Sequence, residues 1–279
     1  MLDKIRAELI GELFYRLDIG VRGDLHKGVV SDERDYVSRL VTHLEYPYGF
    51  FNNIIYYGLG LKGKWFAKVN KGTQERRFGC DSMIVFEAKD QLKVGLFEAK
   101  WPRVLIDPFY DWDKIYKNKS VSHFTDQIER QANWSRQAAI WEMFFYEEAP
   151  GIFSSPFDLS GSSCVKHEFA KAYIDGPQRP PYAWGNNDLE NLIGLAQTTS
   201  AETNLRTIIK EILNCKMGRA IPINSGERTF TLTAYNGDRE ICPILKFDSG
   251  NDNMDFLNEF MVSKGLSFFG HLKIESEDL

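Results

Sequence analysis

Apolar residues recur along the chain with two different spacings, and the spacing separates helical from extended segments. Residues 2–17 carry leucine and isoleucine at helical intervals between charged residues, and residues 36–44 do so again after the N-cap candidates Ser31 and Asp32. Residues 88–91 have the composition of a hairpin turn. Short apolar runs bounded by turn residues predict strands over residues 64–69, 78–86 and 92–101.

The second half of the chain has a more mixed pattern. Residues 121–148, rich in Gln and Trp, predict one long helix that ends before Pro150. Asn236-Gly237 is a strong turn signal and predicts a hairpin of residues 228–235 with residues 239–247. We expect further strands over 153–157, 164–173 and 266–274, and further helices over 188–199, 201–215 and 254–264. We expect loops at Gly20, Gly23 and Gly28, over residues 52–63, and over the proline-rich residues 175–185.

These elements predict an α/β protein with a mixed central sheet flanked by helices. Residues 1–150 would form the core of the protein. Residues 151–279 would form a C-terminal α+β part that completes the sheet or contacts the substrate. The two parts form one continuous domain or two modest ones, since 279 residues allow either.

Composition narrows the class of protein. The hydrophobic share of 43% and the charged share of 26% are ordinary for a soluble domain. No apolar run reaches the roughly 18 residues of a membrane span, and residues 2–17 lack the uninterrupted apolar stretch of a signal peptide. We therefore expect a cytoplasmic protein that does not contact membranes. The four cysteines and five histidines are scattered, so we expect reduced cysteines and no zinc site.

Charge is unevenly distributed along the chain. The net charge of −5 argues against a uniformly basic nucleic-acid binder, but an enzyme needs a favourable field only at its cleft. Two basic groups, one within residues 62–77 and one within residues 100–119, flank the candidate site described below. They are solvated surface or contacts to a polyanion. On the second interpretation the nucleic-acid-binding residues are Lys62, Lys64, Lys68, Arg76, Arg77 and Arg103.

A glycine-rich stretch from Gly58 to Gly63 matches the GxGxxG pattern and most of a phosphate-binding loop. Such a loop must open a helix, whose N-terminal amides hold the phosphate. The residues that follow have no helical apolar face, and Trp65 stands where a magnesium-binding Ser or Thr would be. We therefore interpret the stretch as a flexible loop. A helix directly after Gly63 would restore the nucleotide-binding interpretation.

Three charged residues lie at the ends of the two strongest predicted strands. Asp81 opens one strand, and Glu98 and Lys100 end its partner. Side chains alternate faces along a strand, so Glu98 and Lys100 point the same way, beyond a run of apolar residues on that face. Charges in such a position are costly unless something uses them. With a hairpin turn near residues 89–90, Asp81 falls opposite Glu98 and Lys100, and the three groups converge.

These residue types suit the hydrolysis of a phosphodiester. The reaction needs a hard cation that polarises the phosphate and lowers the pKa of a bound water. Asp81 and Glu98 would supply carboxylates to Mg²⁺, for which Mn²⁺ can substitute, and the carbonyl oxygen of Ala99 would supply another ligand. Lys100 would orient the attacking water or stabilise the developing negative charge.

The order of Asp81, a hairpin, Glu98-Ala99-Lys100 and a helix resembles the core of the PD-(D/E)xK nucleases, the restriction-endonuclease-like superfamily. The resemblance covers roughly residues 31–148. It implies a core of helix, three strands, helix and strand. It also implies an Mg²⁺-dependent deoxyribonuclease, an endonuclease of restriction or defence type. The pattern departs at Cys80, which replaces the Pro that usually precedes the Asp.

The resemblance also implies supporting residues on two helices. An acidic residue on the first helix often helps to bind the metal, and Glu33 is our candidate, with Asp32 and Asp35 as competitors. Glutamines on the helix after the lysine support the site in some families, and Gln127 and Gln131 are in that position. A polar helix face with no such role is the alternative for the two glutamines.

The bare motif is not specific, because Phe86-Glu87-Ala88-Lys89 repeats the letters of residues 97–100. The first copy lies at the predicted hairpin turn, where Glu87 and Lys89 should be solvated, so context favours the second copy. Two alternatives stay open: a surface hairpin with an incidental salt bridge, and a non-catalytic protein of this fold that binds nucleic acid or a protein. RNA as a substrate and a homodimer also stay open.

Overall fold

The computed structural model describes residues 2–47, 49–68, 77–102, 112–115, 122–146, 160–177, 183–199, 202–247 and 254–275. Its helices are α1 (Lys4–His26), α2 (Glu33–Glu45), α3 (Phe50–Gly58), α4 (His123–Ala132), α5 (His167–Asp175), α6 (Asn186–Gln197), α7 (Leu205–Leu213) and α8 (Met254–Lys264). Its strands are β1 (Leu61–Ala67), β2 (Ser82–Ala88), β3 (Gln91–Lys100), β4 (Ala139–Phe144), β5 (Ser163–Lys166), β6 (Ile221–Pro222), β7 (Thr229–Thr233), β8 (Arg239–Pro243) and β9 (Phe268–Ile274).

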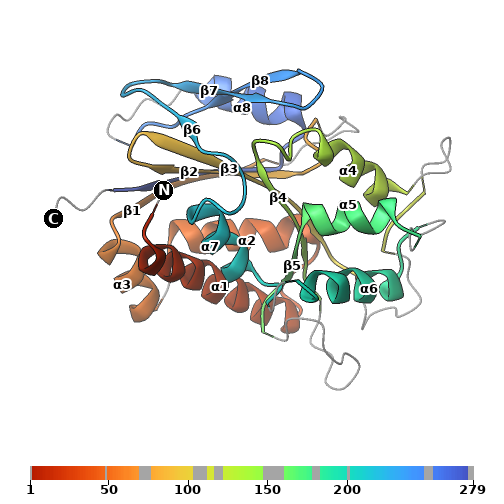
Figure 1. Ribbon diagram of the computed structural model, residues 1–279. Coiled ribbons are helices and arrows are strands. Elements are labelled where there is room, and N and C mark those ends of the chain that lie inside the picture. The colour runs from red at the N-terminus through yellow and green to blue at the C-terminus, as the bar shows by residue number, and fades with distance from the viewer. Residues whose placement is uncertain are drawn as a thin grey trace.

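A mixed sheet runs through the centre of the molecule (Figure 1). Its order among the described strands is β1-β9-β2-β3-β4-β5, and β6 pairs with the start of β3. The β2–β3 hairpin is antiparallel, whereas β4 is parallel to β3 and β9 is parallel to β2. The predicted α/β class with a mixed sheet is therefore confirmed.

Helices cover both faces of the sheet. On one face α1, α2 and α7 share an apolar core with Phe86, Phe97 and Trp141. On the other face, α8 and the β7–β8 hairpin cover Val85, Val94 and their neighbours. Farther along this second face, α4, α5 and α6 form a third cluster over the β4–β5 edge. The polar residues of the candidate site lie between the second and third clusters.

The predicted long helix over residues 121–148 is wrong. Residues 123–132 are helical as α4, but the chain then turns over residues 133–138 and enters β4. Every residue of β4 is buried, because the strand lies between two neighbours and under helices. A strand covered on both faces does not alternate apolar and polar residues, so its pattern is compatible with a helix.

Other boundaries also differ from the sequence prediction. Helix α1 continues through Gly20 and Gly23, because Val21, Arg22 and Leu25 are buried against the molecule and fix the helical backbone there. Residues 52–58, predicted as part of a loop, belong to α3, and residues 167–173, predicted as part of a strand, belong to α5. The predicted strand over residues 153–157 lies outside the described residues.

Several predicted elements are present where the pattern places them. These include the β2–β3 and β7–β8 hairpins, helix α8 and strand β9. Asp32 caps α2, its side chain accepting a hydrogen bond from the amide of Asp35. The glycine stretch that resembles a phosphate-binding loop leads into strand β1 and not into a helix, which removes the support for nucleotide binding there. Among the described helices, none has both the length and the apolar character of a membrane span.

Candidate active site

The pairing of β2 with β3 sets the position of the first acidic residue. The ladder runs from Ala88↔Gln91 to Ser82↔Phe97. Asp81 precedes Ser82, and continuing this register by one step brings Asp81 opposite Glu98. Residues that face each other across an antiparallel pair project to the same side of the sheet. Both side chains are buried, Asp81 being 3% exposed and Glu98 0%.

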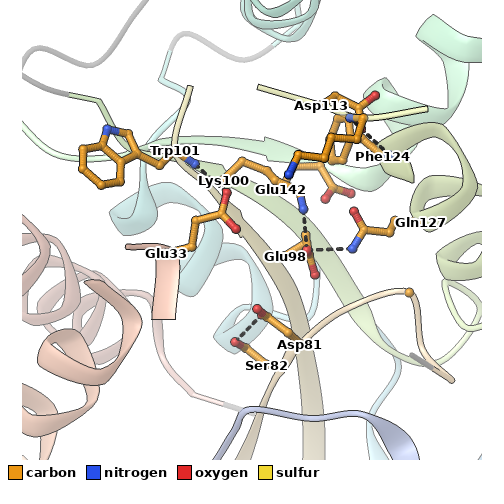
Figure 2. Close-up of polar contacts among 12 residues, drawn as sticks. Glu33, Asp81, Ser82, Glu98, Lys100, Trp101, Asp113, Phe124, Gln127 and Glu142 are labelled. Carbon is orange, nitrogen blue, oxygen red and sulfur yellow. Dashed lines mark hydrogen bonds and ion pairs between the residues drawn. The ribbon is translucent and has the colours of Figure 1, made fainter. Parts of the chain in front are cut away.

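Glu98 accepts hydrogen bonds from the side chains of Lys100 and Gln127. Its Oε1 accepts a bond of 2.7 Å from Lys100 Nζ and a second bond of 2.7 Å from Gln127 Nε2. Lys100 lies two residues along β3 on the same face, and Gln127 comes from α4 (Figure 2). The hydrogen bond from Gln127 orients the carboxylate, and Lys100 compensates its buried charge.

The backbone of Asp81 is anchored by the C-terminal strand. Its carbonyl oxygen accepts bonds from the amides of Ser267 at 2.7 Å and Phe268 at 3.1 Å. The Ser82 hydroxyl donates to Asp81 Oδ1 at 2.8 Å (Figure 2). The position of this carboxylate therefore depends on β9 as well as on the β2–β3 hairpin.

Glu33 reaches the same end of β3 from the first turn of α2. Its Oε1 accepts a bond of 3.0 Å from the amide of Trp101, the residue directly after Lys100 (Figure 2). Tyr36, Val37 and Leu40 are buried along the same helix. The competing acids have local roles, since Asp32 is the cap of α2 and Asp35 pairs with Arg39.

A further buried acid, Glu142, is missing from the sequence prediction. It pairs with Glu98 in the parallel β3–β4 register and is 0% exposed. Gln131 Nε2 donates to Glu142 Oε2 at 3.2 Å, and His167 Nδ1 lies 2.9 Å from Gln131 Oε1. Gln131 thus contacts a second carboxylate and not Glu98. Because residues 121–148 were predicted as one helix, Glu142 was not identified as a neighbour of Glu98; only a strand places the two residues side by side.

The surroundings of Glu142 disfavour its charge. Burial raises the pKa of Glu142, hydrogen bonding and charge interactions with His167 and Gln131 oppose the shift, and the neighbouring Glu98 adds to it. Three buried carboxylates, of Asp81, Glu98 and Glu142, therefore lie on one face of the sheet with Lys100 as a positive partner.

Among the described residues that were predicted to bind nucleic acid, Lys62 and Lys64 lie away from these carboxylates. Lys62 pairs with Lys273 of β9, five residues from the end of β9 that contacts Asp81, or roughly 17 Å along the strand. The Lys62 side chain forms an ion pair with Glu275 at 2.5 Å, and Lys64 Nζ donates to the carbonyl oxygen of Lys246 at 2.6 Å.

The other residues that were predicted to bind nucleic acid differ in position. Lys68 lies at the same end of the sheet as Asp81, since its amide bonds the carbonyl of Ser267. Arg77 forms ion pairs of 2.6 Å with Asp238 and 2.7 Å with Glu240. Arg76 and Arg103 lie outside the described residues.

The first copy of the repeated motif has a different environment. Lys89 is exposed in the hairpin turn, as predicted. Glu87 is only partly exposed, because it pairs with His271 Nε2 at 2.9 Å and Lys273 at 3.5 Å. It lies at the opposite end of β2 from Asp81, so the context separates the two copies.

The carboxylates are suited to magnesium by their chemistry. Within the described ranges, no group of three or more His, Cys, Asp or Glu side chains is arranged to hold a metal ion. Mg²⁺ is commonly bound through one or two carboxylates, with waters and substrate phosphate completing its octahedron. Asp81 and Glu98 supply two such groups, and a divalent cation would offset their buried charge.

Comparison with known proteins gives no relative: no family model, no curated protein and no solved structure matches this chain.

Proposed function

We propose that this chain is a metal-dependent nuclease of the PD-(D/E)xK kind that hydrolyses DNA phosphodiester bonds, with endonucleolytic cleavage in restriction or defence as its setting. The observation that carries the proposal is the strand register that brings Asp81 opposite Glu98, whose carboxylate binds Lys100 at 2.7 Å. Two buried acids at one end of a sheet can hold the cation that the reaction uses, and a lysine beside them can stabilise the developing charge.

The order of the elements supports the same proposal. Apart from the short α3 between α2 and β1, the chain runs through helix α2, strands β1, β2 and β3, helix α4 and strand β4, which is the order helix, three strands, helix and strand. The arrangement departs from a simple three-stranded meander, because β9 lies between β1 and β2. The insertion leaves the β2–β3 hairpin intact.

Each residue has a role that follows from its contacts. Asp81 and Glu98 would hold the metal, with Glu33 as a further acid at the end of β3. Gln127 orients Glu98 through the bond of 2.7 Å. Lys100 would face the phosphate and stabilise the charge that develops on it. The cation, Mg²⁺ or Mn²⁺, would polarise the phosphate and activate water for attack.

Cleavage of supercoiled plasmid tests this function. We expect nicking or linearisation with Mg²⁺ or Mn²⁺ that EDTA abolishes. Lys100→Ala should lower the cleavage rate by at least about 100-fold, the order found when a transition-state charge stabiliser is removed. Lys89→Ala is the matched control, because it removes the lysine of the other motif copy from an exposed turn, and it should cleave like the unaltered protein.

Other substrates define when the proposal fails. Single-stranded DNA and RNA are tested under the same conditions, with folding of each variant checked by circular dichroism. Folded protein that cleaves none of them would contradict the proposal and favour a non-catalytic binding protein. Cleavage that survives in Lys100→Ala would contradict the assignment of the site.

A further inference from the structure

A cavity of about 340 Å³ opens beside Lys100. It lies between the start of α2 and the start of α4, and Figure 2 shows two of its lining residues, Glu33 and Asp113, on either side of Lys100. Its basic lining residues are Arg34, Lys100, Lys114 and His123, and the others are Asp32, Glu33, Trp101, Trp112 and Asp113. The volume is at the lower end of the range for small-ligand sites and suits a nucleotide-sized group.

The acidic residues of this cavity already serve the fold. Asp113 Oδ1 accepts bonds from the amides of Lys114 and Phe124, and its Oδ2 accepts from the Ser122 hydroxyl and the amide of Trp184. Asp32 caps α2, and Glu33 accepts from the amide of Trp101. These oxygens are therefore engaged with backbone and hydroxyl donors.

The cavity also has donors suited to an anion. Arg34 and Lys114 are exposed, and no ion pair involving either is present among the described residues. Trp112 is 8% exposed, and its indole Nε1–H is buried without a hydrogen-bond acceptor in the described part of the chain. A buried donor without an acceptor is costly, and the residue that carries this donor lines the cavity.

We propose that this cavity binds a phosphate group of the nucleic-acid strand adjacent to the phosphate that is cleaved, with Arg34, Lys114 and the Trp112 indole as its donors. This inference rests on the proposed nuclease function. It moves the phosphate contacts from residues 62–77 to the beginnings of α2 and α4. A nucleic-acid strand bound in this way would pass Lys100, because Lys100 both lines the cavity and bonds to the buried carboxylate of Glu98.

Binding measured without cleavage tests the proposal. The full chain is titrated in EDTA into a fluorescent 20-mer oligodeoxynucleotide, single-stranded or duplex, and anisotropy gives Kd at several salt concentrations. The double variant Arg34→Gln/Lys114→Gln should raise Kd by at least about tenfold. Loss of this phosphate contact should also reduce the slope of log K against log salt by roughly 0.7 for the single strand.

Two further variants separate binding from folding. Trp112→Phe keeps a ring in the core and removes the donor, and it should raise Kd several-fold while its circular dichroism spectrum stays unchanged. Lys89→Gln removes one positive charge at the far hairpin turn and should leave Kd unchanged.

The outcomes distinguish this site from the function on which it rests. A protein that binds and cleaves DNA, but whose double variant binds with unchanged Kd and salt slope, would overturn the phosphate site and leave the nuclease assignment in place. A protein that neither binds nor cleaves any nucleic acid would overturn both. Equal weakening by Lys89→Gln would show a general charge effect and also overturn the site.

Discussion

Two glutamates, Glu98 and Glu142, lie side by side on parallel strands with no solvent exposure. Burial of a carboxylate is unfavourable unless it is paired, and here one has Lys100 and Gln127 as donors while the other has Gln131 and the nearby His167. An apolar pair would pack in this position at less cost. The unfavourable free energy of burying two carboxylates is consistent with a chemical use of these groups.

The raised pKa of Glu142 predicts how its replacement affects stability. In the unfolded chain the group loses its proton near its ordinary pKa of 4.5, but the folded protein, because of burial, retains the proton to higher pH. The contribution of Glu142 to the free energy of unfolding therefore falls as pH rises above about 4.5, until Glu142 is ionised in the folded state too. The Glu142→Gln variant has no carboxyl group at this position, so its stability lacks this dependence on pH.

The measurement is urea unfolding of both proteins in EDTA between pH 5 and pH 8. The free energy of unfolding of Glu142→Gln should increase relative to the unaltered protein as pH rises. A difference that is constant over this range, or that moves the other way, would contradict the assignment.

At the same scale, the sequence predicted the site in part. The period of two places Glu98 and Lys100 on one face, and the hairpin turn brings Asp81 opposite, so local rules were sufficient for these three residues. The neighbour of Glu98 on β4 depends on a parallel pairing between segments about 40 residues apart, which no local pattern reports. Glu142 therefore could not be found without the fold.

Among the elements, α4 packs closely against the loop that leads into β2. Gly79 has a φ of +70°, and a Cβ there would lie 2.4 Å from the backbone oxygen of Gln127. The carbonyl of Gly79 also accepts a bond of 3.1 Å from Gln131. This contact sets the distance between α4, with its two glutamines, and the strand that begins after Asp81.

Gly79→Ala should therefore destabilise the protein by about 2–5 kcal/mol, since left-handed backbone strain adds to a collision with backbone. Gly237→Ala is the matched control. Gly237 has a φ of +88°, but a Cβ added there would meet no atom within 4 Å, so only the strain of about 1–2 kcal/mol remains. Urea unfolding measures both. Equal destabilisation would mean that the approach of α4 is not tight.

Elements with strong local signals were predictable, and elements that depend on tertiary contacts were not. The Asn236-Gly237 turn carries its own signal, and α8 lies where the sequence predicts a helix. The turn before β4 contains neither Gly nor Pro over residues 133–138, so nothing in the sequence interrupts the helix. Helix α1 passes through two glycines because burial of its neighbours outweighs their low helix propensity.

At the scale of the whole molecule, the sheet depends on its last strand. β9 lies between β1 and β2, and β1 has no other partner among the described strands. Gly270 of β9 faces the Trp65 ring so closely that a Cβ would lie 2.3 Å from it. The strand thus joins the two parts of the sheet by hydrogen bonds and by tight side-chain packing.

A chain that ends at Lys264 should consequently lose cooperative thermal unfolding and be recovered mostly as aggregate, because β1 and β2 would present unpaired edges. A chain that ends at Glu275 keeps every described element and is the control. Circular dichroism melts of the soluble fractions compare the two. A cooperative transition in the shorter chain would show that the rest of the sheet closes without β9.

The bonds from Ser267 and Phe268 to the carbonyl of Asp81 also have a consequence in time. During synthesis at about 5–20 residues per second, roughly 10–40 s pass between the appearance of Asp81 and that of Phe268. Over that interval the Asp81 backbone lacks its anchor, and the carboxylates cannot reach their final arrangement. On the proposed function, a nascent chain therefore cannot cut nucleic acid until Ser267 and Phe268 have been synthesised and have bonded to Asp81.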